Sequence, residues 1–258
     1  MRDQMAKSEP LTVEQDVAQA RLQLEALRAH HGQGGQGGAL RAGVFGINDG
    51  LVSNFSLVLG VAGADPGRHF VLLAGIAGLL AGAFSMAAGE YVSMKVQREL
   101  FEALIARERE EIETEPESER QEVEVIFRAQ GVPREDAGRL ASRVMADPNI
   151  ALDLMARQEL GLNPDELGSP WGAAISSFLC FSSGALLPLL PFLFLPDGTV
   201  LQIAIVLCAL ALFAVGAATA HLSKRPALFG GLRMLVIGAA AAAVTFAVGR
   251  LLGVSIAG

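Results

Sequence analysis

The sequence has 258 residues, of which 52% are hydrophobic and 18% are charged, and its formal net charge is −7. The apolar residues form long, nearly charge-free runs, and the acids concentrate between Glu99 and Glu124. This distribution excludes an ordinary soluble globule, whose helices mix polar positions into every turn, and it argues against a nucleic-acid-binding protein, which needs a basic face.

The N-terminal segment, residues 1–38, is polar. Leucines and valines among charged residues predict a short amphipathic helix within residues 1–31, and HGQGGQGG at 31–38 is typical of a flexible linker. His30 and His31 could bind a metal, but adjacent residues do not share a helix face, so a solvated tail is the favoured interpretation. Because the first apolar run follows this segment, we expect no cleavable signal peptide, and the first span should act as the insertion signal.

Apolar runs of membrane-spanning length follow, since a bilayer core of about 30 Å needs about 20 residues in a helix. They cover residues 41–64, 69–94, 171–195, 199–222 and 227–252. No helix breaker follows the second run until Glu115-Pro116, so one long helix is expected to leave the membrane there. Pro188 and Pro191 are expected to bend the third span, where neighbouring helices must satisfy the freed backbone groups.

Residues 117–168 have a soluble, helical pattern. Helices are expected from Ser118 to Gln130, from Arg134 to Met145, and from the Asp147-Pro148-Asn149 turn through Leu160. The sequence therefore predicts an all-α integral membrane protein with five transmembrane helices. Its predicted parts are an N-terminal helix and linker at 1–38, spans one and two at 39–94, a cytoplasmic glutamate-rich helical metal-binding domain at 95–168, and spans three to five at 169–258.

Basic residues next to the spans predict the orientation, because they favour the cytoplasmic side. With a cytoplasmic N-terminus, the cytoplasmic side receives Arg41, Lys95, Arg98, Lys224 and Arg225. The opposite side receives only Arg68 and Arg250. The inserted domain is then cytoplasmic and the C-terminus is extracytoplasmic.

Asp49 is the residue that is hardest to explain as structure. A carboxylate in the first half of a membrane span costs about 2.5–3.5 kcal/mol on insertion scales, and such acids usually mark an ion path or a proton relay. The alternative is that Asp49 lies at the membrane interface and caps a broken helix together with Asn48 and Gly50.

Met86 and Glu90 lie in the second span at i and i+4, which places them on one helix face. The Met86 thioether is a soft ligand that favours late transition metals over Mg²⁺ or Ca²⁺. The alternative is that Met86 only fills an apolar core. Glycines at 75, 78, 82 and 89 leave room for another helix to approach closely.

The segment 99–124 contains eleven glutamates and three arginines. Two i, i+3 pairs, Glu108 with Glu111 and Glu119 with Glu122, each project from one helix face, and Pro116 folds the second helix back toward the first. Clustered carboxylates repel one another unless a cation lies among them, and oxygen ligands suit divalent metals. A solvated acidic face is the alternative, and spacing alone does not choose these pairs over Glu99/Glu102 or Glu110/Glu113.

Glu159 and Met155 could add one hard and one soft ligand, since they are four residues apart on the last soluble helix. The alternative is a surface glutamate beside a core methionine. The sequence contains no nucleophile elbow, phosphate loop, zinc-type Cys/His spacing or GxGxxG signature, so it does not indicate acyl transfer, phosphoryl transfer or ATP use.

The sequence resembles the vacuolar iron transporter family, in a bacterial form. The resemblance rests on GVFGINDGLVSNFSLVLGVAGA, SMAAGEYVSMKVQRE, the glutamate-rich arm, MARQELGL and GALLPLLPF, in that order over residues 40–252. It implies a homodimeric Fe²⁺ and Mn²⁺ exporter that exchanges metal for protons, located as a multi-pass protein in the cell (inner) membrane. It also implies that no cofactor is permanently bound, because the divalent metal is the substrate.

The resemblance assigns roles to individual residues. The family's intramembrane aspartate and methionine correspond to Asp49 and Met86, to which we add Glu90 as a candidate. The family's soluble metal-binding residues correspond, by register, to Glu108, Glu111, Glu119, Glu122, Glu159 and Met155. The family has a pair of methionines where Ala156 follows Met155 here, which weakens the case for soft ligands in the soluble site.

The expected function is therefore proton-coupled export of Fe²⁺, and also Mn²⁺, rather than catalysis. One alternative is a membrane-anchored ferroxidase, but di-iron bundles use Glu-x-x-His motifs and residues 95–168 contain no histidine. The other alternative is a metal-sensing membrane scaffold, which leaves Asp49 and the glycine-rich second span unexplained.

Overall fold

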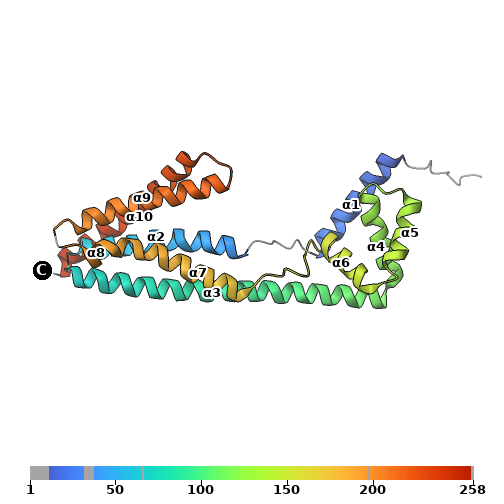
Figure 1. Ribbon diagram of the computed structural model, residues 1–258, viewed down its shortest axis with the longest axis horizontal. Coiled ribbons are helices and arrows are strands. Elements are labelled where there is room, and N and C mark those ends of the chain that lie inside the picture. Colours follow the sequence, from blue (N-terminus) through green and yellow to red (C-terminus); the bar gives the residue numbers. More distant parts are fainter. Residues whose placement is uncertain (1–11, 32–37, 66, 197, 257–258) are drawn as a thin grey trace, which may run out of the picture. The chain divides into compact units, whose positions relative to one another are not determined.

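The computed structural model describes residues 12–31, 38–65, 67–196 and 198–256, and this part of the chain contains helices but no strand. The chain divides into two compact units. We call residues 37–95 and 169–258 the apolar unit, and residues 1–36 and 96–168 the acidic unit. Both units are helical, so the predicted all-α class is confirmed (Figure 1).

Among the described residues, five helical segments are long and apolar enough to cross a membrane, which confirms the predicted number of spans. They are α2 (Gly38–Gly63), α3 (Arg68–Thr114), α7 (Pro170–Leu186) with its continuation, α9 (Val200–Leu222) and α10 (Ala227–Ile256). The helix α3 has 47 residues, because no glycine turn or proline interrupts the chain between its apolar first half and its glutamate-rich second half.

The third span is interrupted at the predicted prolines. The helix α7 ends at Leu186, a 3₁₀ turn η1 follows at Leu187–Leu189, and the short helix α8 covers Leu190–Phe194. Pro188 and Pro191 lack the N–H group that an α-helix uses for its i to i−4 hydrogen bond, which explains why the regular helix stops there.

Helix α2 is the centre of the apolar unit, where it packs most extensively against α7 and α10. Glycine makes the α2–α7 contact possible, because a Cβ atom on Gly184 would collide with the carbonyl oxygen of Ile47. Beneath this contact, Leu51 and Phe55 of α2 are buried against Cys208 and Leu212 of α9. By contrast, most apolar side chains of α3 and α10 are exposed within the single chain, as is typical of helices that face lipid.

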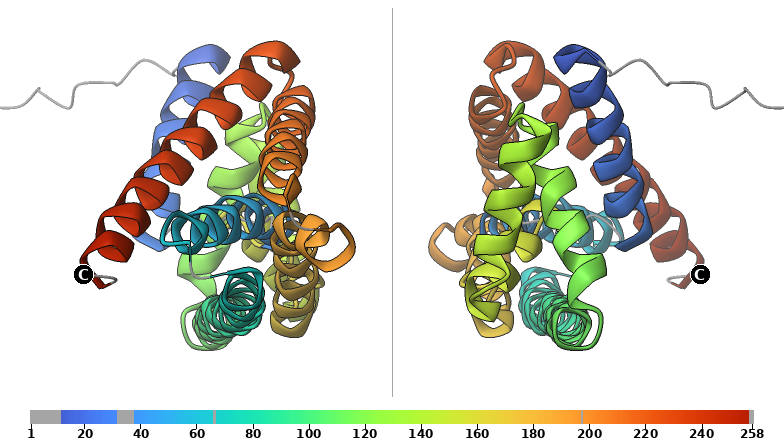
Figure 2. Two further views of the ribbon diagram at one scale, coloured as in Figure 1. Left: turned by 90° about the vertical axis from the view of Figure 1, so that its left-hand side faces the viewer. Right: turned by 90° about the vertical axis from the view of Figure 1, so that its right-hand side faces the viewer.

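The acidic unit combines α1 (Val13–His31), the end of α3, and three short helices: α4 (Pro116–Ala129), α5 (Arg134–Val144) and α6 (Pro148–Gln158). These bounds lie close to the predicted helices, although α6 ends at Gln158 and Glu159 is its C-cap. Figure 2 shows α1 beside α4, against which it packs. The predicted helix at 1–31 is present from Val13 onward, and most of the predicted linker at 31–38 lies outside the described residues.

Candidate metal sites

A polar cavity lies within the apolar unit, between α2, α3 and α7, and its volume is about 440 Å³. Its lining residues are Asp49, Ser53, Asn54, Leu57, Gly78, Gly82, Ser85, Met86 and Phe181. Asp49 and Met86, which the sequence places on separate spans, therefore line the same cavity, which we call the Asp49–Met86 cavity. Asp49 is exposed within the single chain and Met86 is half-buried.

Glycine keeps this cavity open on the α3 side. A Cβ atom on Gly82 would collide with the ring of Phe181, and one on Gly78 would collide with the side chain of Leu57. Phe181 is itself buried against Ala83 and Ala185, so it cannot move aside freely. Larger residues at these two glycines would therefore fill the space next to Met86.

Asn54 is a cavity residue that the sequence analysis missed. Its side chain is 2% exposed, and its Nδ2 group donates a hydrogen bond to the carbonyl oxygen of Ala185 at 2.5 Å. Its Oδ1 atom is buried and has no hydrogen-bond partner. A polar residue in an apolar span five positions after Asp49 was the signal that could have identified it, because such residues are costly inside a membrane.

Glu90 is not among the described residues that line the Asp49–Met86 cavity, although it lies one helical turn after Met86. Its side chain is half-buried, and its Oε2 atom is buried without a hydrogen-bond partner. The structure thus brings together two of the three predicted path residues and leaves the third outside the cavity.

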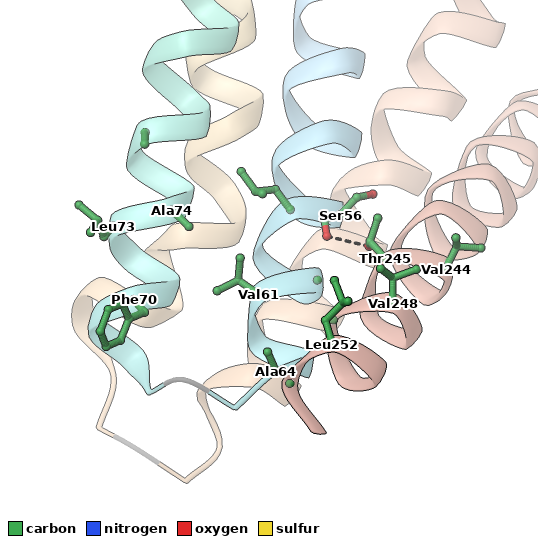
Figure 3. Close-up of a pocket in the computed structure, with 15 residues that line it drawn as sticks. Ser56, Val61, Ala64, Phe70, Leu73, Ala74, Val244, Thr245, Val248 and Leu252 are labelled. Carbon is green, nitrogen blue, oxygen red and sulfur yellow. Dashed lines mark hydrogen bonds between the residues drawn. The ribbon is translucent and has the colours of Figure 1, made fainter. Parts of the chain in front are cut away.

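A second, larger cavity of about 670 Å³ lies between α2, α3 and α10 (Figure 3). Its walls are apolar side chains such as Val61, Phe70 and Leu252, and none of its lining residues carries a charge. The hydroxyl of Thr245 donates a hydrogen bond to the carbonyl oxygen of Ser56 at 2.7 Å within this wall. Because divalent cations need charged or polar ligands, this cavity is a poorer candidate for a metal path despite its size.

In the acidic unit, the predicted glutamates come together, and we call Glu108, Glu111, Glu119, Glu122 and Glu159 the carboxylate cluster. Glu108 on α3 is 2% exposed, Glu119 on α4 is 6% exposed and Glu159 at the end of α6 is 2% exposed. Three separate elements therefore bury carboxyl groups toward one another. The break between Thr114 and Pro116 positions α4 so that its glutamates return to those of α3.

The surroundings of the buried carboxyl groups favour their neutral form. Burial, followed by the charges of Glu111 and Glu122, raises the pKa of Glu108 to about 7. Burial, followed by the charges of Glu122 and Glu108, raises the pKa of Glu119 to about 8. Burial also raises the pKa of Glu159, together with the charges of Glu108 and Glu122. Loss of water and like-charge repulsion thus act in the same direction.

Burial separates the glutamate pairs that spacing alone could not distinguish. Glu99, Glu102, Glu110 and Glu113 are exposed, and Glu102 forms an ion pair with Arg98 at 2.7 Å. Glu108, by contrast, has one buried oxygen, Oε1, without a hydrogen-bond partner. An exposed, solvated face describes the first group but not Glu108, Glu119 and Glu159, whereas Glu111 is half-buried and forms an ion pair with Arg107 at 2.9 Å.

Burial and the charges of the neighbouring carboxyl groups both favour protonated carboxyl groups in the cluster. Within the described part of the chain, no group of three or more His, Cys, Asp and Glu side chains has the arrangement of a preformed metal site. Carboxylates bind metal only when deprotonated, so a cation entering the cluster must displace these protons and reorient the side chains.

Met155 is fully buried in the apolar core of the acidic unit, among Ile112, Val123 and Leu152. Its carbonyl oxygen accepts the backbone hydrogen bond of Glu159 at 2.8 Å. The structure therefore places Met155 next to Glu159 along the chain, in surroundings that also suit a core methionine.

Comparisons with known proteins add independent information. A sequence model described as the VIT family matches residues 40–250. The "Vacuolar iron transporter" of Acanthamoeba castellanii is 35% identical over 222 residues, which are 84% of this chain and 80% of that protein. "Vacuolar iron transporter 1" of Arabidopsis thaliana is 32% identical over 80% of this chain and 83% of that protein. "Vacuolar iron transporter 2" of Oryza sativa subsp. japonica is 30% identical over 92% of this chain and 96% of that protein.

Proposed function

The chain belongs to the VIT family, and we propose that it is a transporter that exports Fe²⁺, and also Mn²⁺, from the cytoplasm across a membrane. The matched relatives are named as iron transporters, and the chain has five helices that could span a membrane. The metal is the substrate in this proposal, and the chain is not an enzyme.

The observation that carries the proposal is the Asp49–Met86 cavity. It places a carboxylate from α2 and a thioether from α3 on one polar space within a unit of otherwise apolar helices. A carboxylate with a thioether suits a late first-row divalent metal better than Mg²⁺ or Ca²⁺, which prefer oxygen ligands alone. We assign the transport path to Asp49 and Met86, with Glu90 one turn beyond the cavity.

We propose that the carboxylate cluster collects metal in the cytoplasm and supplies it to this path. Buried carboxyl groups with raised pKa values support this role, because isolated surface glutamates do not gather in this way. The same groups couple metal binding to proton release. The N-terminus and the acidic unit are cytoplasmic and the C-terminus is extracytoplasmic in this proposal, as the distribution of basic residues next to the spans suggests.

Proton coupling is the proposed source of energy. A proton and a divalent cation compete for the single carboxylate of Asp49, and competition at one site is the minimum requirement for exchange. The sequence contains no nucleotide-binding motif that would supply another source. Export of metal would then accompany entry of protons, and we propose that the transporter works as a homodimer in the cell (inner) membrane.

A metal-sensing scaffold is the second candidate, since the carboxylate cluster alone could bind iron and signal. The polar cavity around Asp49 argues against it, because a scaffold needs no such space inside its spans. The ferroxidase alternative lacks histidines in residues 95–168.

The test is a flux assay in liposomes that contain a pH-sensitive dye, with Fe²⁺ added outside under reducing conditions. Metal movement should change the internal pH, and an imposed proton gradient should accelerate flux in one direction only. The variant Asp49→Ala, reconstituted at equal density, serves as the control. Flux that follows membrane voltage alone and ignores the proton gradient would indicate a channel or uniporter instead.

A further inference from the structure

The side-chain amide of Asn54 is buried and lines the Asp49–Met86 cavity, but the proposed transport path assigns it no role. Its Nδ2 group is fixed by the hydrogen bond to the Ala185 carbonyl oxygen, which can only accept, so the amide orientation is determined by its partner. The Oδ1 atom must then point away from the Ala185 carbonyl oxygen. It lies toward Gly78 across the cavity, where an added Cβ atom would be 3.0 Å away from it.

An unpartnered amide oxygen that is 2% exposed is costly in a folded protein, and a cation or water is what normally satisfies it. Asn54 follows Asp49 by five residues on α2, which is a rise of about 7.5 Å along a helix axis. The oxygen therefore belongs to a different position along the cavity.

We propose that Asn54 Oδ1 forms a second, deeper ion-binding position in the Asp49–Met86 cavity, which the divalent cation occupies after it leaves Asp49 and Met86. This proposal rests on the proposed transport function. A neutral amide oxygen can replace one water of the ion without adding a charge that would trap it, so it suits an intermediate position. Its role is to lower the barrier to passage rather than to set the affinity for entry.

The test is steady-state Fe²⁺ flux of the full chain in liposomes for Asn54→Leu, which keeps the branched shape of the side chain and removes the oxygen together with the Nδ2 donor. We expect kcat to fall about tenfold, with KM within about twofold of the wild-type value, because entry at Asp49 is unchanged. The control is Ser177→Ala, which likewise removes a buried oxygen without a hydrogen-bond partner, here a hydroxyl, at a residue that does not line the cavity. Its kcat and KM should both stay at the wild-type values.

The nearly isosteric variant Asn54→Asp keeps an oxygen at the position and adds charge, while it replaces the Nδ2 donor to the Ala185 carbonyl oxygen with an acceptor. It serves as the second variant if Asn54→Leu does not fold. It should bind the ion more tightly and release it more slowly, and both kcat and KM should fall. An unchanged kcat in both Asn54 variants would overturn the proposal. If Asp49→Ala retains full flux, the proposed function fails instead, and the two failures are therefore distinguishable.

A second observation concerns α1, which lies before the family match begins at residue 40. Arg128 at the end of α4 forms a buried ion pair with Asp16 of α1, in which its Nε group donates to Oδ2 at 3.1 Å. Arg21 Nε of α1 donates to the carbonyl oxygen of Ala129 at 3.3 Å, and Arg28 Nε donates to that of Gln158 at 2.8 Å.

These contacts connect α1 to the C-terminal ends of both α4 and α6. The last carbonyl groups of a helix lack intrahelical partners and carry a partial negative charge, so guanidinium groups are well suited to them. Ala20 and Leu24 complete the contact by packing against Ile126 and Ala129. Since α4 carries Glu119 and Glu122, and Glu159 follows Gln158 directly, α1 connects two of the elements that supply the carboxylate cluster.

We infer that α1 is a clamp that holds the ends of α4 and α6 in place and thereby positions Glu159 against the glutamates of α4. Arg28 is the positioning residue, because its hydrogen bond lies one residue before Glu159. Loss of this hydrogen bond should release the end of α6 and weaken metal binding at the cluster. This inference also rests on the proposed role of the cluster.

The test compares Arg28→Gln with Arg157→Gln, which breaks exposed ion pairs on α6 with Asp153 and Asp165 but does not involve α1. In the full chain, hydrogen exchange of residues 155–162 should accelerate in Arg28→Gln only. Its Fe²⁺ dissociation constant should rise about tenfold, which is the lower end of the effect of one lost hydrogen bond to a charged donor. The variant Arg28→Lys, which keeps a cationic donor, should recover most of the affinity.

Exchange at 155–162 that is equal in Arg28→Gln and the wild type would overturn the clamp, whatever the metal affinity. If exchange accelerates but Fe²⁺ affinity is unchanged, α1 holds the helix ends without positioning the cluster, and the inference is wrong. If changing Glu108 and Glu119 to Gln leaves wild-type Fe²⁺ binding intact, the collecting role proposed for the cluster fails instead. The exchange measurement still decides whether α1 holds α6.

Discussion

Binding of Fe²⁺ to the carboxylate cluster should release protons and depend steeply on pH. Burial and neighbouring carboxylates raise the pKa of Glu108 to about 7 and that of Glu119 to about 8. Both groups are therefore largely protonated in mildly acidic solution, whereas a divalent cation binds their ionised forms. Lowering the pH should weaken metal binding, because protons and metal compete for the same oxygens.

The size of the effect follows from these two values. Treated as independent groups, Glu108 and Glu119 are both ionised about fiftyfold more often at pH 7 than at pH 6, and the apparent Fe²⁺ affinity should rise by about the same factor. At pH 7 the two groups together should release about 1.4 protons per metal bound. Glutamates with an ordinary pKa near 4.3 would change the affinity by less than about twofold over this range.

The assay is anaerobic titration calorimetry on the full chain in detergent, with Asp49→Ala as background to remove the path site. Titrations in buffers with different ionisation enthalpies give the number of protons released directly. The variant Glu110→Gln changes an exposed glutamate of α3 and should leave the pH dependence intact, whereas Glu119→Gln should reduce it. A flat affinity between pH 6 and pH 7, with no proton release, would refute the assignment of raised pKa values to a metal site.

Three further predictions test other parts of the structure. Without metal, the acidic unit should lose stability as the pH rises from 6 to 9. The reason is that the pKa values of Glu108 and Glu119 in the folded state lie above those of unfolded glutamates, so protonation stabilises the folded state. Thermal unfolding followed by circular dichroism should show this loss, and Fe²⁺ should reverse it. Gly82→Leu, which collides with Phe181, should reduce Fe²⁺ flux in liposomes by about tenfold or more, whereas Gly89→Leu on the same helix meets open space and should not. Asp49→Ala should abolish Fe²⁺ flux while the protein still inserts, and flux at the wild-type rate would contradict the path assignment.

The fold was predictable from the sequence because each signal that defines it is local. A membrane span needs only enough consecutive apolar residues, and Pro188 interrupts α7 through its own missing N–H group. The long helix α3 was predictable for the same reason, since nothing interrupts it before Glu115. These properties belong to short stretches of chain and do not depend on which helices become neighbours.

The candidate sites were only partly predictable, because they depend on contacts between distant residues. By spacing, Glu108 and Glu110 were equally good candidates for a metal ligand. Only the packing of α3, α4 and α6 buries Glu108 and leaves Glu110 exposed. The orientation of Asn54 depends on the Ala185 carbonyl oxygen, 131 residues later in the chain. The sequence of α2 alone could not predict that the Nδ2 group of Asn54 has a hydrogen-bond partner while its Oδ1 atom has none.

The two sites differ in the charge that they offer to a cation, and this difference fits a transporter. The carboxylate cluster combines five glutamates, which suits the capture of a dilute divalent ion. The Asp49–Met86 cavity offers one carboxylate with a thioether, serine hydroxyls and an amide, so one positive charge of the ion remains uncompensated there. An ion held in this way in a medium of low dielectric constant is bound weakly and can leave. In the proposed function, capture requires more negative charge around the ion than release does, and the two sites differ in this direction.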